Sequence, residues 1–244
     1  MNTTSEGRKP LYQQRIFWLW LPLVLVFLPY VVHALDPELY ERRIRTEYGL
    51  VENLTAVFLA AAVVFGGLVS LGERGKRMPG IVRAFVGLLT LGCFYFLGEE
   101  ISWGQHYFGW ATPEVLAAMN EQGETNLHNI GGWSEASLDQ GPRNLLTLGA
   151  LVGGVLIPLR WSRAPKSSFW GWLWPTAYLV PSAFLAVTAS LPQKIAKAFG
   201  EVPFLLDISG GESKELFLSL FLLIYLWTLW FRSDPRRGFE PAGA

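Results

Sequence analysis

The sequence predicts an all-α membrane protein, a polytopic helix bundle of about six transmembrane helices with its N- and C-termini in the cytoplasm. Of the 244 residues, 51% are hydrophobic, and the mean hydropathy is +0.28. Uncharged apolar runs recur along the whole chain, and most of them reach the ~20 residues needed to cross ~30 Å of hydrocarbon. Lysine and arginine gather in alternate connections between these runs, which is typical of cytoplasmic loops.

Six apolar runs are the expected spans, and they cover roughly residues 16–35, 51–72, 81–103, 144–160, 168–191 and 214–231. The first run could instead be a signal peptide, but no small-x-small cleavage pattern and soluble domain follow it, so we expect a retained helix. The fifth run contains Pro175 and Pro181, which remove backbone donors and predict a kink or a break. The expected layout is a cytoplasmic segment at 1–15, a six-span domain at 16–231 and a cytoplasmic tail at 232–244.

The distribution of basic residues sets the expected orientation. The N-terminus, the second and fourth connections and the tail are the most basic segments and should be cytoplasmic. The third connection, residues 104–143, has Arg143 as its only basic residue and should therefore lie outside. The first connection, residues 36–50, is an exception, because its arginines are balanced by acidic residues.

The stretch "GEEISWGQHYFGW", residues 98–110, places polar side chains at the outer end of the third expected span. Glu99 and Glu100 end the apolar run, and the three histidines of the chain all fall on the same side of the membrane. The second span begins on that side and adds Glu52 and Asn53. Because ionisable groups at membrane depth are costly, their convergence indicates a functional site.

Residue spacing suggests how these groups meet. If the third helix continues to Tyr107, then Glu99, Ser102 and His106 share one face, since they are spaced i, i+3 and i+7. A carboxylate and an imidazole on one face can form an ion pair, an acid–base pair or two ligands of a metal. The alternative is that these residues only mark where the helix meets water.

We therefore predict a single site at the outer interface. Its catalytic candidates are Glu99, Glu100, His106 and His128, and its substrate-binding candidates are Gln105, Glu124, Asn126 and Asn129. Glu99, His106 and His128 are also the candidate ligands of a divalent metal such as zinc. His128 can join the other residues only if the third connection folds back onto the membrane helices.

The third connection contains two segments that predict order. "TPEVLAAMNEQG" predicts a short helix with Thr112 as its cap, Pro113 in the first position and Gly123 at its end. "GETNLHN", residues 123–129, is expected to fold back onto the outer end of the third span, because connections of ~40 residues are usually either functional or disordered. The capped helix argues against disorder.

Two resemblances accompany these motifs. "GEEISWGQ", followed by "TPE" and "GETNLHN", resembles a pattern of uncharacterised bacterial multi-pass membrane proteins, and so does the upstream "EYGLVENLTA". That resemblance implies a bacterial inner-membrane protein without a defined reaction. Glu99 and Glu100 also match the start of the Glu-Glu-x-x-x-Arg motif of the CPBP intramembrane proteases. Gly104 stands in place of its arginine and no Phe-x-x-x-His follows, so that family's roles are not carried over.

The remaining sequence evidence limits the function classes. The formal net charge of zero gives no indication of nucleic-acid binding, so the lipid bilayer is the one partner expected. Cys93 is the single cysteine, which excludes an intramolecular disulfide. No HExxH, CxxC, GxSxG or Walker motif is present. The leading hypothesis is an enzyme acting on a lipid-linked or membrane-proximal substrate, and the alternative is a non-enzymatic transporter, assembly or structural subunit.

Overall fold

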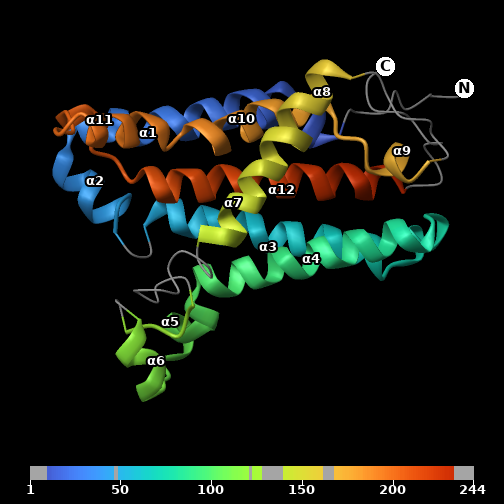
Figure 1. Cartoon of the computed structure of the whole chain (residues 1–244), viewed down its shortest axis with the longest axis horizontal. Helices are drawn as coiled ribbons and strands as arrows, with labels where there is room; N and C mark the ends of the chain where they lie inside the picture. The colour runs from blue at the N-terminus through green and yellow to red at the C-terminus, as the bar shows by residue number, and fades with distance from the viewer. Residues whose placement is uncertain (1–9, 47–48, 121–122, 128–139, 162–167, 234–244) are drawn as a thin grey trace, which may run out of the picture.

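The chain forms an all-helical bundle in a computed structural model that describes residues 10–46, 49–120, 123–127, 140–161 and 168–233 (Figure 1). These ranges contain no β-strand. The apolar runs of the sequence become helices because a helix satisfies its own backbone hydrogen bonds, which an apolar environment demands. The predicted all-α class is confirmed.

Four helical segments are long and apolar enough to cross a membrane. The segments are Ile16–Leu35, which joins η2 (Ile16–Trp20) to α1 (Leu21–Leu35); α3 (Leu50–Ser70); α4 (Gly80–Glu100); and Phe204–Arg232, which contains η9 (Phe204–Leu206) and α12 (Gly210–Arg232). They correspond to the first, second, third and sixth expected spans. The prediction of a membrane protein is confirmed at this level.

The other two expected spans differ in form. The fourth is helical throughout, as α7 (Gln140–Gly149), η7 (Ala150–Leu156) and α8 (Ile157–Arg160). The fifth divides into α9 (Phe169–Leu173), η8 (Ala177–Leu179) and α10 (Val180–Thr188). The chain is non-helical around Pro175, so the predicted break is confirmed there. Pro181 lies in the first turn of α10, where its missing donor costs nothing.

Helix α12 is the centre of the bundle. It lies between a layer that includes α1 and α10 and a layer formed by α3 and α4 (Figure 1). Its run from Leu216 to Ile224 is buried, unlike the lipid-compatible faces of α1, α3 and α4. Gly154 of η7 permits one of the closest approaches, because a Cβ there would lie 2.3 Å from the Ala183 Cβ and 2.7 Å from the Phe221 ring.

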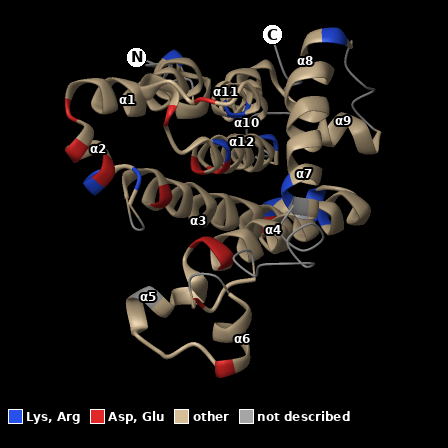
Figure 2. Cartoon of the chain, turned by 60° about the vertical axis from the view of Figure 1, so that its left-hand side comes forward, with Lys and Arg blue, Asp and Glu red and all other residues tan. Residues whose placement is uncertain are grey.

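The two ends of the bundle differ in charge (Figure 2). At one end, called the basic end here, Arg74 of η3 (Glu73–Arg77) lies 4.7 Å from the centre of the Trp230 ring. Tyr12 of η1 (Leu11–Gln13) packs against Trp227 and Phe231 at the same end. The first and last described helices of the chain therefore meet there.

The opposite end is called the carboxylate end, and it is defined by α2 (Pro37–Arg43), the last turn of α4 and the first turn of α12. Helix α11 (Leu191–Ala198) also lies at this end. Beyond α4, the chain forms η4 (Ser102–Gly104), α5 (Gln105–Phe108) and α6 (Glu114–Met119), which lie to the side of the bundle (Figure 1). The polar residues singled out from the sequence gather at this end.

Candidate functional site

Helix α4 stops at Glu100, and the chain then reverses within a few residues. Ser102 and Trp103 have φ values of 45° and 55°, and Gly104 has 93°. Positive φ at residues other than glycine costs on the order of 1–3 kcal/mol each and persists only where the surroundings impose it. The condition for a common helical face of Glu99, Ser102 and His106, a helix that continues to Tyr107, is therefore not met.

The reversal is held by the side chain of Trp103. Its ring lies against Gly98, where a Cβ would come within 2.8 Å of the ring atoms. Its Nε1 donates a hydrogen bond of 2.8 Å to Oε1 of Glu99. Glycine at position 98 thus makes room for the ring, and Glu99 fixes the ring's orientation.

The "GETNL" segment, residues 123–127, folds back onto this turn. The Leu127 amide donates to Oε2 of Glu99 at 2.7 Å. Ser102 Oγ donates to Glu124 Oε2 at 2.7 Å and accepts from Asn126 Nδ2 at 2.9 Å. The predicted return of the loop to the end of the third span is confirmed for these residues.

A second group of hydrogen bonds joins the middle of the loop. Gln105 Nε2 donates to Thr112 Oγ1 at 2.8 Å, and the Thr125 amide donates to Gln105 Oε1 at 2.7 Å. Thr112 Oγ1 donates to the Gly123 carbonyl at 2.6 Å. Thr112 does not cap a helix as predicted, because its hydroxyl ties the two ends of the loop together and α6 begins only at Glu114.

Three predicted substrate-binding residues are thus engaged within the loop. Gln105, Glu124 and Asn126 all form hydrogen bonds with neighbouring loop groups. The carbonyl and side-chain oxygens of Asn126 also accept hydrogen bonds of 2.9 Å from Asn120 Nδ2. The fourth candidate, Asn129, lies outside the described residues. These bonds give the three side chains a positioning role around the turn.

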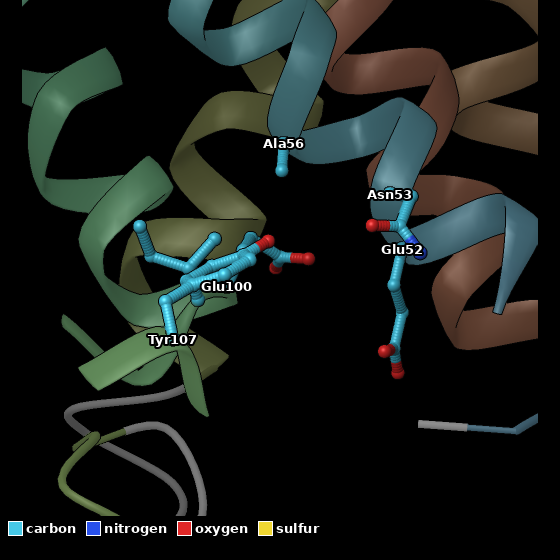
Figure 3. A pocket seen from close by; sticks show the side chains of 6 residues that line it. Glu52, Asn53, Ala56, Glu100 and Tyr107 are labelled. Carbon is cyan, nitrogen blue, oxygen red and sulfur yellow. The ribbon is translucent and has the colours of Figure 1, made fainter. Parts of the chain in front are cut away.

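The two adjacent glutamates have different surroundings. Glu99 is buried, and both of its carboxylate oxygens accept N–H donors. Glu100 instead faces a pocket on the α3 side, with Glu52 and Asn53 opposite it and Tyr107 at its rim (Figure 3). The cavity is open to solvent and has a volume of about 10 Å³, room for about one water molecule. Of the two glutamates, Glu100 is the one placed to meet a ligand.

Further charged groups, from α12 and α7, act on Glu100. Glu215, Arg143, Glu52 and Glu212 act electrostatically on Glu100. Arg143 Nη2 forms an ion pair of 2.7 Å with Oε1 of the buried Glu215. Within the described part of the chain, Glu212 Oε2 is buried without a hydrogen-bond partner. Four carboxylates from three helices thus lie near one another at this end of the bundle, with Arg143 acting on Glu100 and Arg45 on Glu212.

Sequence reasoning missed the contribution of α12 and of Arg143 to this site. Glu215 falls inside the sixth apolar run, and an ionisable residue within a span is itself a functional signal. That signal could have drawn attention to Glu212 and Glu215. The partnership with Arg143 spans a long sequence separation and has no local signature.

Of the three histidines, His33 is the one whose side chain the structure describes. His33 is buried between the rings of Tyr40 and Phe204, whose centroids lie 4.7 Å and 4.2 Å away. The Tyr40 hydroxyl accepts the Ser209 amide at 3.0 Å, and burial raises the pKa of this hydroxyl. His128 and the side chain of His106 lie outside the described residues.

The metal hypothesis has no support from the residues that are described. Among them, no three His, Cys, Asp or Glu side chains form a group that could hold a metal ion. Glu99, the one proposed ligand whose side chain is described, bonds to Trp103 and Leu127. The proposed zinc site therefore stays a prediction.

The chain matches no protein-family model, and no curated protein or solved structure is detectably similar to it. Its function must therefore be argued from the pocket and its charges.

Proposed function

We propose that this chain is a multi-pass membrane enzyme that acts on a lipid-linked or membrane-proximal substrate in the pocket between Glu52 and Glu100. The observation that carries this proposal is the pair of glutamates, Glu52 of α3 and Glu100 of α4, that line one cavity at the end of two membrane-length helices. A pocket with convergent polar groups is the default binding site of an uncharacterised protein.

The proposed topology has six spans, with both termini in the cytoplasm and the carboxylate end outside, in a bacterial inner membrane. Two features support it. Arg74 and the packing of Tyr12 on Trp227 place a basic connection and both ends of the described chain at one end of the bundle. The motifs "GEEISWGQ" and "GETNLHN" support the bacterial assignment through their resemblance to multi-pass bacterial proteins.

The proposed chemistry is general acid–base catalysis of group transfer. One carboxyl group removes a proton from the attacking hydroxyl or water, and the other returns a proton to the leaving group. Asn53 and the Tyr107 hydroxyl lie at the pocket and would orient the substrate. A hydrolase and a transferase differ here only in whether water or a substrate hydroxyl is the nucleophile.

The proposal is tested by turnover in a native lipid mixture. We would incubate the protein in nanodiscs made from a bacterial lipid extract and follow the lipids by untargeted mass spectrometry. Glu100→Gln should slow product formation by about 10²–10⁴-fold, the usual contribution of a general acid or base. Glu38→Gln is the matched control, because Glu38 lies on exposed α2 at the same end.

Two outcomes would contradict the proposal. Undiminished turnover in Glu100→Gln would show that Glu100 and its pocket take no part in the reaction. No turnover of any lipid or added lipid-linked substrate by the unmodified protein would favour the non-enzymatic alternative.

A further inference from the structure

The loop beyond α4 has its polar and apolar side chains arranged in reverse of a soluble domain. This region, residues 102–120 and 123–127, is called the aromatic lobe here. Its polar residues Ser102 and Asn126 are each only 1% exposed, while Phe108 is 79% exposed and Val115 is 73% exposed. In water a folded segment buries its apolar groups and exposes its polar ones. The lobe instead buries these polar groups and exposes these apolar ones, while Glu114 of α6 is exposed as well.

The buried polar groups of the lobe hold a defined shape. The bonds around Ser102, Gln105, Thr112 and Asn126 link its start, middle and end. A chain segment that faces hydrocarbon must satisfy its polar groups internally, because lipid offers no hydrogen bonds. The internal bonding of the lobe meets this requirement for Ser102, Gln105, Thr112 and Asn126.

The outward surface of the lobe carries the residue types found at membrane interfaces. Phe108 and Trp110 stack with their ring centroids 5.7 Å apart and are both exposed, and Tyr107 is exposed beside them. The sequence has no lysine or arginine between Ile101 and Pro142. Aromatic side chains gather at the headgroup level of membranes, where an apolar ring and a polar edge are both accommodated.

The position of the lobe indicates that its binding partner is the membrane that the bundle itself crosses. Figures 1 and 2 both place α5 and α6 to the side of the bundle, below α3 and α4, rather than beyond the ends of the helices. Along the helix direction, the lobe is level with the carboxylate end (Figure 1). A segment at that depth and to that side of membrane-crossing helices lies where the lipid headgroups are.

We propose that the aromatic lobe docks into the headgroup layer of the membrane that holds the bundle, with Phe108, Trp110 and Val115 facing the acyl-chain boundary. Tyr107 belongs both to the lobe and to the rim of the Glu52–Glu100 pocket. The docked lobe therefore holds the pocket mouth at headgroup depth, where a lipid can enter from the side. Docking itself does not depend on whether the pocket is catalytic.

The test is the depth of probes attached to the lobe. In a Cys93→Ala background, an environment-sensitive fluorophore is attached to Phe108→Cys or, in a second variant, Val115→Cys. Glu38→Cys on α2 is the control at the same end of the bundle. Each protein is placed in nanodiscs that hold one copy, and quenching by iodide is compared with quenching by lipids that carry a nitroxide near the headgroup.

The lobe probes should be quenched by the nitroxide lipid and should be about tenfold less sensitive to iodide than the control, because aqueous ions are excluded below the headgroups. Iodide quenching equal to that of the control would overturn the proposal. Protection seen only in discs with two copies would also overturn it, because the cover would then be a second chain. Glu100→Gln should leave quenching unchanged, so failure of the catalytic proposal is detected separately.

Discussion

Glu99 and Glu100 are adjacent residues of the same type, yet their side chains have different contacts. Glu99 points to the loop, where Trp103 and Leu127 donate to its two oxygens. Glu100 points to the pocket, among other carboxylates. Successive helix residues are turned by about 100° from each other, so an adjacent pair at a helix end can serve two faces. In an adjacent pair of glutamates, one residue can therefore stabilise the turn while the other lines the pocket.

Replacing each carboxylate in turn tests whether Glu99 and Glu100 have different roles. Glu99→Leu should lower the free energy of unfolding by about 2–6 kcal/mol, because two part-buried N–H donors lose their acceptor at about 1–3 kcal/mol each. Glu100→Leu should change it by less than about 1 kcal/mol, since it removes a charge that lies among like charges. Denaturant unfolding in detergent measures both, and equal losses would show that the two residues share one role.

A second prediction concerns the glycine beneath the Trp103 ring. Gly98→Ala should cost about 1–3 kcal/mol of stability, the usual penalty for overpacking, because its Cβ would collide with the ring. Gly92→Ala in the same helix is the matched control, since nothing lies within 4 Å of its Cβ position. It should be neutral or stabilising by up to about 1 kcal/mol. If thermal unfolding gives both variants the same midpoint, the ring does not hold the turn.

The smallest expected effect separates the ring of Trp103 from its hydrogen bond. Trp103→Phe keeps an aromatic ring but removes the donor to Glu99, so we expect a loss of about 1.5 kcal/mol, the lower range for a bond to a charged group. The change should also increase hydrogen exchange at the Leu127 amide, which shares the same carboxylate. Unchanged exchange there would mean that the two bonds to Glu99 are independent.

The sequence was informative where the physical cause is local. Apolar runs predict the membrane-length helices, and Pro175 predicts the break before α10. The length of the third connection, together with the short helix predicted in it, predicts the return of residues 123–127. These features follow from transfer free energy, from a missing backbone donor and from loop length. Each can be judged without knowing what lies elsewhere in the chain.

The remaining features depend on partners that are distant in the sequence. The reversal at Ser102–Gly104 contains no proline, and a glycine alone does not show that two preceding residues adopt positive φ. That conformation is imposed by the Trp103 ring on Gly98 and by Glu124 and Asn126, which come from the far end of the loop. The approach of Glu215 to Arg143 and Glu100 likewise exists only once the helices have packed.

The bond between Glu99 and the Leu127 amide has a consequence for biosynthesis. The two residues are 28 positions apart, so Glu99 is synthesised before its second donor. At about 5–20 residues per second, this interval is on the order of seconds. Until Leu127 has been made, Glu99 can accept from Trp103 but lacks its second donor, so the turn beyond α4 is incomplete. Completion of the carboxylate end thus waits on synthesis of the loop and then of α12, so a chain that ends before Leu127 would lack both the formed turn and the central helix of the bundle.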